Sequence, residues 1–509
     1  MNKMTNNRKI YDLEVLCETL KQVRGSRKVV HCHGVFDLLH IGHIRHFEQA
    51  KKFGDILVVT VTPDKFVNKG PGHPAFTESL RIEAIASLNC VDYVAINQWP
   101  TAVETVKMIK PDFYAKGSEY QNAENKSNNW IKVEKDAVEE LGGEVVFTSD
   151  ITFSSSNLIN NYIPVFSDEV NEYLKTLRGR YSSNHIIDII NAVQGLRVLV
   201  IGETIIDEYH YVSTMGKSMK EPILASKLIR EEAFAGGALA IANHVASFAD
   251  HVDLVTVLGD YQTKENQVIR SLKENVTPKF FYKKDSPTIV KRRFIESEVL
   301  QKLFEIYIIN DKQLKRSTEK KMCEYLEEKL SDYDVVLVAD YGHGMFTMSS
   351  IDMLCDKSKF LAVNTQANAG NQGHNAISKY PKADFISLAR HEMVLEFRNS
   401  HLSTEEMILE TSKRLSCKNI ICTMGKYGTL AARNDSISHT PAIAPKVVDR
   451  VGAGDAVLSI TSLLSCINAP LDIVGFLGNA AGAEAVATIG NQSTLEKKPF
   501  IKHIESLLK

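Results

Sequence analysis

Paired cysteines are absent from this sequence. Its eight cysteines, among 509 residues, occur singly and never in C-x-x-C or metal-type spacing. A disulfide framework and a cysteine-ligated zinc site are therefore excluded as organising features. Four cysteines lie in or beside apolar runs, which predicts reduced thiols that pack in a core. They are Cys323, Cys417, Cys422 and Cys466.

Long apolar runs and a charge of one sign are also lacking. No apolar run approaches the ~20 residues that cross a bilayer, and the first residues lead into no apolar segment typical of a signal peptide. The 60 basic and 62 acidic residues leave a net charge of −2, so no overall field favours nucleic acid or an anionic membrane. These absences favour a cytoplasmic enzyme without nucleic-acid or membrane partners, with length for two or three cores.

The most informative motif present runs from His33 to His43 and reads H-G-V-F-D-L-L-H-I-G-H. It follows the apolar run 28–32 and precedes an amphipathic stretch at 44–53, which predicts a strand, a glycine-bearing loop and a helix. His40 and His43 would then share one helix face and could point at one ligand. Because the helix start favours a phosphate, the pair suits chemistry at phosphorus. A pair of surface or core histidines is the alternative.

This segment resembles the H-x-G-H motif of the cytidylyltransferase-like nucleotidyltransferases. The resemblance continues through the strand-like run 56–61 and the loop 111–120, which is similar to the K-G-x-[DE]-Y loop of the sugar-phosphate members. It implies that His40 and His43 stabilise charge at the α-phosphate, with Mg²⁺ bridging the triphosphate of ATP or CTP. It also implies that Glu119 contacts the sugar phosphate. The implied nucleotide-binding residues are Gly34, Phe36, Gly42, Lys69, Arg81, Lys116, Ser154, Ser155 and Ser156.

A second motif, D-R-V-G-A-G-D-A, runs from Asp449 to Ala456 and continues into an apolar helical pattern to Leu464. Its two glycines permit close approach of a ligand to the backbone, and the N–H groups of such a helix start can form an anion hole. Asp455 would sit there as a base that accepts a proton from an attacking hydroxyl. A glycine turn with a helix-capping Asp is the alternative.

This second motif resembles the G-A-G-D motif of the ribokinase-like (PfkB-type) sugar kinases. Matching elements lie upstream in the family's order, including an opening strand at 198–207 and a strand and loop at 335–344 that is similar to the S-D-Y-x-K-G loop of the heptose kinases. The resemblance implies catalysis by Asp455 and a metal-organising role for Glu392. The implied nucleotide-binding residues are Thr423, Gly425, Gly428, Gly452, Ala453 and Gly454. The implied sugar-binding residues are Asp207, Gly236, Gly237 and Asp340.

Three positions depart from the family pattern. Ala240 stands where the family has a sugar-contacting Asn, Ala389 replaces the Asn of its N-x-x-E motif, and His343 replaces a Lys of the heptose kinases. These departures leave the phosphoryl-transfer centre in place and the sugar undetermined. Two polar stretches also have two interpretations each. The amide-rich stretch 364–368 is a solvated turn or a sugar contact, and the basic stretch 291–293 is a solvated strand end or a phosphate contact.

The alternation of apolar runs and helical patterns predicts two α/β, Rossmann-like domains with parallel sheets. The strands of the first are expected at 28–33, 56–61, 91–96, 112–115 and 144–148. The expected organisation is an N-terminal extension at 1–26, a nucleotidyltransferase domain at 27–163, a helical linker at 164–195 and a sugar kinase domain at 196–509. Two β-rich insertions, 222–229 and 280–308, resemble the small lid sheet of sugar kinases, which often pairs subunits, so a homodimer is expected.

Together the two resemblances imply a sugar-phosphate kinase joined to a sugar 1-phosphate nucleotidyltransferase. The combination resembles the fused heptose 7-phosphate kinase and heptose 1-phosphate adenylyltransferase of bacterial envelope synthesis, with the domain order reversed. It predicts a nucleotide-activated, heptose-like sugar for lipopolysaccharide or capsule. Three alternatives stay open: a CTP-dependent polyol-phosphate cytidylyltransferase, a degenerate kinase half that only binds a ligand, and a non-enzymatic sugar-nucleotide sensor or scaffold.

Overall fold

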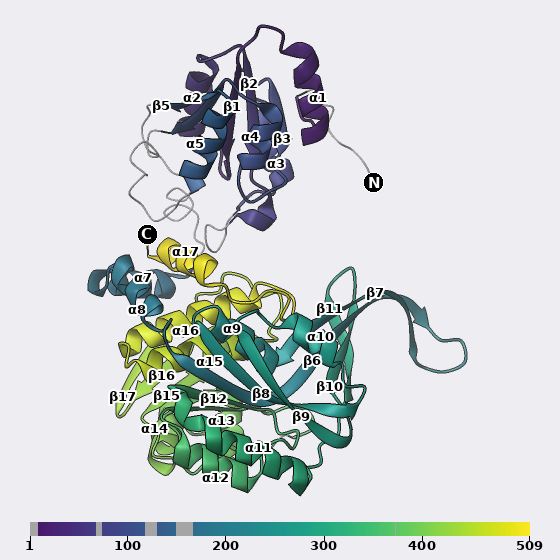
Figure 1. Cartoon of the computed structure of the whole chain (residues 1–509), viewed down its shortest axis with the longest axis vertical. Helices are drawn as coiled ribbons and strands as arrows, with labels where there is room; N and C mark the ends of the chain where they lie inside the picture. Colours follow the sequence, from purple (N-terminus) through teal and green to yellow (C-terminus); the bar gives the residue numbers. More distant parts are fainter. Residues whose placement is uncertain (1–8, 68–73, 118–129, 149–165, 372, 509) are drawn as a thin grey trace. The chain divides into compact units, whose positions relative to one another are not determined.

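The chain folds into two compact units, Met1–Ser167 and Asp168–Lys509 (Figure 1). The computed structural model describes residues 9–67, 74–117, 130–148, 166–371 and 373–508. Both units consist of a largely parallel sheet with helices packed against it, as the alternating sequence pattern predicts. Each unit is described separately below.

The sheet of the first unit has five parallel strands in the order β3-β2-β1-β4-β5. β2 is buried along its whole length, because helices cover both faces of the sheet and pack against its apolar residues. The strands are β1 (Val29–Gly34), β2 (Ile56–Val61), β3 (Tyr93–Ile96), β4 (Phe113–Gly117) and β5 (Glu144–Thr148). All five predicted strands are confirmed. The order of the strands reverses between β1 and β4, and ligands of open parallel sheets bind where the carboxyl ends of such strands diverge.

Helices pack on both faces of this sheet. On one face lie α2 (Ile41–Lys51) and α3 (Glu78–Ala86), which share an apolar core with β1 and β2. The other face is covered by α1 (Leu13–Val23), α4 (Val103–Ile109) and α5 (Trp130–Glu140). The segment 1–26 was expected only to extend the domain. Residues 13–23 within it form a helix whose leucines are buried against the sheet, so this part of the segment belongs to the core of the unit.

The main sheet of the second unit begins with one unusually long strand, β6 (Arg197–Lys217). Its first residues pair in parallel with both neighbours, β8 and β12. The order across the main sheet is β9-β8-β6-β12-β13-β14-β15-β16-β17. These strands are β8 (His251–Tyr261), β9 (Val276–Pro287), β12 (Val335–Asp340), β13 (Leu361–Thr365), β14 (Phe385–Ala389), β15 (Asn419–Thr423), β16 (Thr429–Arg433) and β17 (Ser436–Thr440).

From residue 204 onward, strand β6 leaves the main sheet and becomes part of a smaller lid sheet. Beyond this point β6 pairs with β7 (Leu224–Gly237) and β10 (Ile289–Glu296), and β10 pairs with β11 (Gln301–Ile308). The predicted small lid is thus present, with one correction: residues 280–287 belong to β9 at the edge of the main sheet. They run parallel to β8, whose register they continue. The far ends of β6 and β7 project from the body as an arm (Figure 1).

Helices also cover both faces of the main sheet of the second unit. One face carries α9 (Ala238–Ala246), α15 (Ala453–Cys466) and α16 (Leu471–Val486), which are buried along most of their length. The other face carries the large apolar core, to which helices on that side contribute. They are α11 (Arg316–Lys329), α12 (Met348–Lys357), α13 (Arg390–Phe397) and α14 (Thr404–Arg414). The remaining helices include α10 (Glu265–Ser271) and α17 (Lys497–Leu507).

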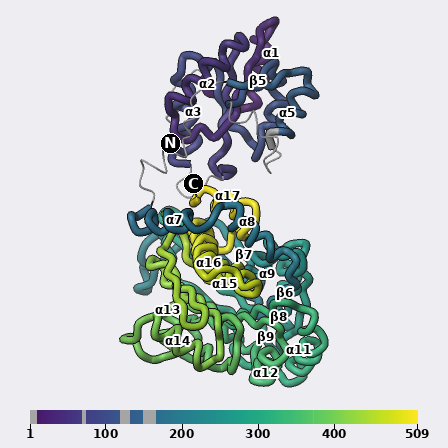
Figure 2. The backbone as a smooth tube through the Cα atoms, turned by 90° about the vertical axis from the view of Figure 1, so that its left-hand side faces the viewer, coloured from purple at the N-terminus to yellow at the C-terminus, as the bar shows by residue number. Residues whose placement is uncertain are grey.

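The segment predicted as a helical linker forms two helices, α7 (Asp168–Arg180) and α8 (Ser183–Ala192). Both belong to the second unit, where they lie beside α17 (Figures 1 and 2). The hydroxyl of Tyr181 donates to Asp472 at 2.9 Å, and that of Tyr173 lies 3.1 Å from the Thr440 hydroxyl oxygen. These contacts attach the segment to the second unit.

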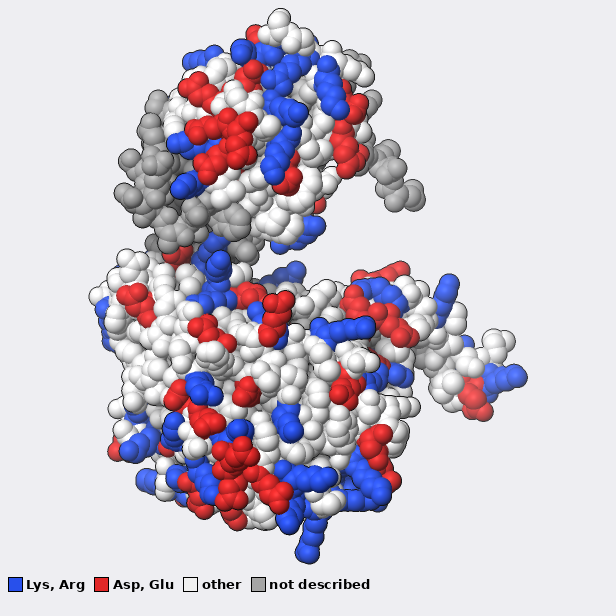
Figure 3. Space-filling view, viewed as in Figure 1, with Lys and Arg blue, Asp and Glu red and all other residues white. Residues whose placement is uncertain are grey.

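Acidic and basic side chains are interspersed over the face of the molecule that Figure 3 shows. Within the described ranges, no helix has the length and apolar character needed to cross a membrane. The cysteines that the structure describes are free thiols, and Cys417 and Cys422 are buried in the core of the second unit, as predicted.

Candidate active sites

His40 and His43 lie at the start of α2, directly after the loop that follows β1. His40 is the N-cap residue, and its Nδ1 accepts the N–H of Gly42 at 3.1 Å. A neutral His40 therefore carries its proton on Nε2, and this buried atom has no partner among the described residues. Burial lowers the pKa of His40 and favours that neutral form. The two imidazole rings stack with centroids 4.0 Å apart, so the pair presents one donor surface.

Phe36 holds the loop before the two histidines in an unusual backbone conformation, with φ of 47°. Its ring packs edge-on against His43, with centroids 5.4 Å apart. A Cβ atom at Gly34 would lie 3.0 Å from the Phe36 ring, so glycine leaves this ring room to pack closely. Gly34, Phe36 and Gly42, predicted to bind the nucleotide, thus build the loop and helix start on which His40 and His43 are presented.

Arg81, predicted to contact the triphosphate, is bonded to groups of the first unit. Its side chain is fully buried, and its guanidinium donates to the carbonyl oxygens of Phe76, Val35 and Thr62 at 3.0, 2.5 and 2.8 Å. It also forms an ion pair with Asp64 at 2.5 Å. Because these partners occupy its donors, Arg81 fastens the loop after β1 to the chain after β2.

Lys116, predicted to contact the nucleotide, also has an internal partner. Its ammonium forms a 2.9 Å ion pair with Glu134 on α5, with side chains only 12% and 8% exposed. The hydroxyl of Tyr114 donates to the same carboxylate at 2.9 Å. Burial opposes ionisation of Glu134, but the charges of Lys116 and His33 and the hydrogen bonds from Lys116 and the N–H of Ala102 together lower its pKa to about 2. Lys116 therefore stands at the carboxyl end of β4 as part of a buried pair.

Five predicted residues of the first unit lie outside the described residues. They are Lys69, Glu119, Ser154, Ser155 and Ser156.

In the second unit, Asp455 lies in the first turn of α15. The N-cap of this helix is Gly452, with φ of 84°, so Asp455 is not the capping residue. Its Oδ1 accepts a 3.0 Å hydrogen bond from the hydroxyl of Tyr341. Burial and the charge of Asp207 raise the pKa of Asp455 to about 7, against the opposing effects of Tyr341 and Lys291. A base with a pKa near the working pH is suited to accept a proton from an alcohol.

Gly452, Ala453 and Gly454, which are predicted to form an anion hole, lie at the same helix start. The first N–H groups of a helix have no partner within it and attract anions. A Cβ added at Gly454 would meet nothing within 4 Å, so the space in front of this turn is open. Gly452 is backed by Asn491, whose Oδ1 would lie 2.0 Å from an added Cβ.

Asp207, the predicted sugar ligand, lies on the lid half of β6. Its carboxylate forms a buried ion pair with Arg293 and lies 3.5 Å from the side-chain nitrogen of Asn491. A Cβ atom at Gly236 would lie 2.2 Å from the Asp207 carboxylate, which explains the glycine. The adjoining Gly237 has φ of 57° and ends β7. The three predicted sugar-site residues Asp207, Gly236 and Gly237 are therefore brought together.

The basic stretch 291–293 is part of this network instead of a solvated strand end. Arg293 contacts Asp207 and Glu305, and Arg292 pairs with Glu208 at 2.8 Å. Lys291 is 5% exposed, and its ammonium lies 5.9 Å from the ring centroid of Tyr341. The carboxylates around them hold these cations at the lid side of the site.

Asp340, predicted as a sugar ligand, is bonded to groups of the second unit. It is 1% exposed, and its carboxylate accepts the Tyr380 hydroxyl at 2.7 Å and the N–H of Gly342 at 3.0 Å. It also pairs with Lys379. These bonds are internal, so Asp340 shapes the loop after β12.

The other two polar features after β12 and β13 also make contacts inside the protein. His343 contacts Asp311 through Nδ1 at 2.9 Å. The amide-rich stretch forms an ordered turn in which Asn364 donates to Ser387 at 2.8 Å and Asn368 donates to the carbonyl of Tyr341 at 2.8 Å.

The predicted nucleotide side lies where β14 and β15 end, because Ala389 and Thr423 are paired in register. Gly425 and Gly428, with φ of 59° and 85°, form the turn between β15 and β16. Glu392 lies in the first turn of α13 and accepts the N–H groups of Ala389 at 2.7 Å and Ala367 at 3.0 Å. Burial is the main cause that raises the pKa of Glu392 to about 7.

The Glu392 carboxylate is the candidate for organising Mg²⁺. No group of three or more His, Cys, Asp or Glu in the described ranges could hold a metal ion. Mg²⁺ at phosphate-transfer sites keeps waters and uses one or two carboxylates together with the substrate phosphates, so a single carboxylate fits such an ion. Glu392 would contact it through water or directly, and its ionised form is the one that can do so.

Residues missed by the sequence reasoning complete the site of the second unit. Asn491, after α16, lies 3.5 Å from the carboxylate of Asp207, and Glu203, at the branch point of β6, accepts the N–H of Tyr341. Tyr341 lies inside a motif that the sequence does show, but its contact with Asp455 joins residues 114 positions apart. No local pattern reports such a contact.

The fold and the two motif sites define an α/β chain that joins a Rossmann-like, H-x-G-H unit to a ribokinase-like unit. The chain belongs to the pfkB family of carbohydrate kinases, whose family model matches residues 196–498. The cytidylyltransferase-like model matches residues 31–188, so a cytidylyltransferase-like domain precedes the kinase-family domain.

Similar proteins have been found by sequence and by structure. The bifunctional protein HldE of Helicobacter pylori strain P12 is 42% identical over 118 residues, which are 23% of this chain and 25% of that protein. HldE of Trichlorobacter lovleyi is 34% identical over 165 residues, 32% of each chain. The chain thus matches about a quarter to a third of the length of these curated relatives.

Phosphofructokinase-2 of Escherichia coli shares the fold of the kinase-family domain. Its structure in complex with substrates and products has a TM-score of 0.51 at 14% identity, and its structure with potassium has a TM-score of 0.50 at 15% identity. Each comparison covers 62% of this chain and 100% of that chain. At this identity the likeness concerns the fold.

Proposed function

We propose that the chain is a bifunctional enzyme. The second unit would phosphorylate a sugar or sugar phosphate with ATP, and the first would join a sugar 1-phosphate to a nucleoside monophosphate with release of pyrophosphate. The observation that carries the proposal is the placement of Asp455, a buried carboxylate at a glycine helix start beside Asp207 of the lid. The membership in the pfkB family supports this kinase activity.

The kinase step follows from the residues at this helix start. Asp455 accepts the proton of the acceptor hydroxyl. The oxygen of that hydroxyl bonds to the γ-phosphorus of ATP, and the bond from the γ-phosphorus to the β–γ bridging oxygen breaks. The N–H groups of Gly452 to Asp455 stabilise the charge that develops on the transferred phosphoryl group. Asp207 orients the acceptor, and the lid sheet on which it lies excludes water.

The nucleotidyl transfer would occur at the start of α2. The phosphate oxygen of the sugar phosphate attacks the α-phosphorus in line, and pyrophosphate leaves. His40 offers an Nε2–H that has no partner among the described residues, and His43 stacks on the His40 ring, so both imidazoles can stabilise charge at the α-phosphate. Mg²⁺, when bound, neutralises charge on the triphosphate.

The finer proposal concerns the product. The resemblance to the fused heptose kinase and adenylyltransferase, together with the relatives named HldE, favours a heptose-like sugar activated for lipopolysaccharide or capsule in the cytoplasm. The changes at Ala240, Ala389 and His343 keep one alternative in view: a CTP-dependent polyol-phosphate cytidylyltransferase whose kinase unit only binds ligand.

Incubation of the whole chain with ATP or CTP and a panel of phosphorylated heptoses and polyols, followed by mass spectrometry, tests the proposal. A bisphosphorylated sugar and a nucleotide-linked sugar are expected. Nucleotide transfer from CTP to a polyol phosphate, with no sugar-dependent ATP turnover, would favour the alternative.

The acid limb of the kinase pH profile is expected near pH 7. Burial raises the pKa of Asp455 above its ordinary value of 3.8 to about 7, and only the ionised form accepts a proton. The value of kcat/KM should therefore fall about ten-fold per pH unit below pH 6 and level off above pH 8. Steady-state rates at saturating ATP measure this profile. A rate independent of pH between 5 and 8 would contradict the assignment of the base.

We also propose that the chain forms a homodimer through the arm, defined as residues 213–229. The arm exposes six large apolar side chains, an unusual density for a solvated surface. They are Met215, Met219, Ile223, Leu224, Leu228 and Ile229. Sedimentation is expected to give twice the 56.9 kDa of one chain. Ile223→Arg should shift the mass toward one chain, whereas Val15→Arg, at an exposed apolar residue of α1, should not.

A further inference from the structure

A continuous set of hydrogen bonds connects the branch point of the sheet to the proposed catalytic base. Glu203 is the last residue of β6 before this strand leaves the main sheet for the lid, and it is 2% exposed. Its two carboxylate oxygens accept the N–H groups of Tyr341 at 3.0 Å and His343 at 3.1 Å. A single buried carboxylate therefore holds the backbone of the loop that follows β12.

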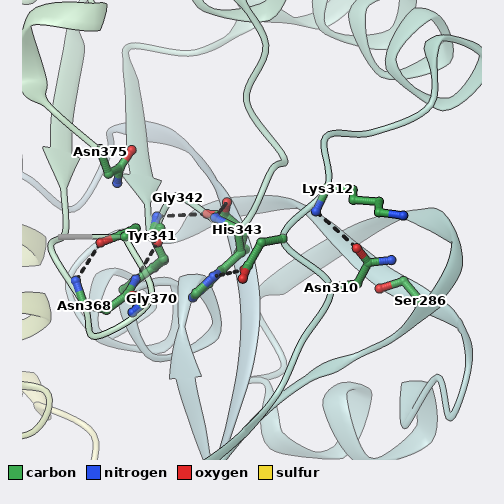
Figure 4. A network of polar contacts seen from close by, with 12 residues as sticks. Ser286, Asn310, Lys312, Tyr341, Gly342, His343, Asn368, Gly370 and Asn375 are labelled. Atoms are coloured by element: carbon green, nitrogen blue, oxygen red, sulfur yellow. Dashed lines mark hydrogen bonds and ion pairs between the residues drawn. The ribbon is translucent and has the colours of Figure 1, made fainter. Parts of the chain in front are cut away.

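The same loop is held from its other side by amides. The carbonyl oxygen of Tyr341 accepts hydrogen bonds from the side chains of Asn368 at 2.8 Å and Asn371 at 2.7 Å. Figure 4 shows Asn368 beside Tyr341 and Gly342, with His343 on the opposite side. Gly342 has φ of 71°, and a Cβ there would lie 2.4 Å from the Asn371 amide nitrogen, so glycine is required. The backbone at Tyr341 is thus fixed by donors and acceptors together.

The side chain of Tyr341 connects this fixed loop to the proposed catalytic base. It is 2% exposed, and its hydroxyl lies 3.0 Å from Asp455 Oδ1. Among the described residues, Tyr341 donates a hydrogen bond to the side chain of Asp455. A carboxylate bound through one oxygen presents the other in a defined direction.

We propose that Tyr341 is a positioning residue of the kinase site, whose hydroxyl holds Oδ1 of Asp455 so that Oδ2 faces the acceptor hydroxyl, and that Glu203 fixes the loop from which Tyr341 acts. This inference rests on the proposed kinase function of the second unit. It assigns a role to two residues that do not touch the transferred phosphoryl group.

The groups around Asp455 determine in which direction its pKa changes when the Tyr341 hydroxyl is removed. Asp207 on β6 raises the pKa of Asp455, and Lys291 on β10 and the hydroxyl of Tyr341 lower it. Glu392 on α13 is a further neighbour, since the charge of Asp455 raises the pKa of Glu392. Loss of the Tyr341 hydroxyl leaves the other groups in place, so the pKa of Asp455 should rise.

The test is Tyr341→Phe, which keeps the ring and removes the hydroxyl. A hydrogen bond to a charged group corresponds to a shift of about one pH unit, so the acid limb of kcat should move from near pH 7 to near pH 8. The rate should be roughly five-fold lower at pH 7 and close to that of the unsubstituted protein at pH 9, with KM for ATP unchanged. A merely structural tyrosine would lower the rate equally at all pH values.

Tyr333→Phe is the matched control. Tyr333 is also a buried tyrosine that donates its hydroxyl to a carboxylate, that of Asp253, but it has no contact with the site. Its replacement should leave the pH profile unmoved. Glu203→Gln, which loses one of two acceptors, should shift the acid limb in the same direction as Tyr341→Phe.

A direct titration makes the result independent of turnover. Carbon-13 NMR of protein labelled at the aspartate carboxyl carbon, with the Asp455 signal assigned from Asp455→Asn, should show the pKa of Asp455 rise in Tyr341→Phe. An unchanged pKa in Tyr341→Phe would overturn the inference. Absence of sugar-dependent ATP turnover in the unsubstituted protein would instead reject the proposed kinase function. The NMR titration would still show whether the Tyr341 hydroxyl affects the pKa of Asp455.

Discussion

Asp455→Asn is expected to lower sugar-dependent ATP turnover by roughly 10²–10⁴-fold, the range that general-base catalysis contributes. Asparagine keeps the shape of the side chain and can still accept the Tyr341 hydroxyl, but it cannot take a proton from the acceptor. Binding of MgATP should persist, because the backbone of Gly452 to Gly454 forms the anion hole. Nucleotidyl transfer with ready-made sugar 1-phosphate should be unaffected.

Thermal stability provides a second readout for the same variant. The folded pKa of Asp455, about 7, lies above the ordinary 3.8 of an unfolded aspartate, so folding binds the proton. The stability contributed by this proton is present below about pH 4 and is lost as the pH rises through 7. Asp455→Asn should therefore melt at a higher temperature than the unsubstituted protein at pH 8.

The exposed Asp435 in the turn after β16 offers a matched control, and Asp435→Asn should change neither turnover nor melting. The competing interpretation of Asp455 as a helix cap predicts little change, since Asn caps as well as Asp. The structure already assigns the N-cap to Gly452. A folded Asp455→Asn protein with undiminished ATP turnover would remove Asp455 from the mechanism.

His43→Ala is expected to lower nucleotidyl transfer by roughly 10²–10³-fold, by analogy with removal of one donor that stabilises a transition state. His43 stacks on His40 with centroids 4.0 Å apart and packs against Phe36, so its loss also frees the ring of His40. Pyrophosphate release in the presence of sugar 1-phosphate and ATP or CTP measures the effect. Circular dichroism should show that the variant remains folded.

Kinase turnover by His43→Ala should equal that of the unsubstituted protein, because Asp455 lies in the other compact unit. The reciprocal pattern is expected for Asp455→Asn. Equal loss of both activities in a folded variant of either kind would contradict the assignment of two separate sites. Absence of both activities in the unsubstituted protein would leave the third alternative, a sensor or scaffold.

The sequence predicts the frame of each site well where the signal is local. The five strands of the first unit, the helix start at His40 and His43 and the glycine helix start before Asp455 are all confirmed. Such features depend on apolar periodicity and on the backbone freedom of glycine, and both can be read from a short stretch of sequence. The family resemblance adds the order of the elements along the chain.

The roles of individual polar side chains stay predictions. Arg81, Lys116 and Asp340 have the residue types that ligand contacts require, yet each is bonded to partners inside the protein. A buried charge must be paired, and a pairing partner can come from any part of the chain. The lid shows the same limit for backbone: residues 280–287 have a strand-like pattern, but only pairing decides that they join β8 in the main sheet.

The sequence by itself determined the α/β class of both units, their order along the chain and the positions of the two motifs, because these follow from patterns within a few turns of the backbone. Only the tertiary structure decided which polar groups meet. Tyr341 reaches Asp455 across 114 residues, and Asp207 meets Arg293 across 86. Such contacts arise where the carboxyl ends of parallel strands converge, and burial there makes each group depend on partners that no local pattern contains.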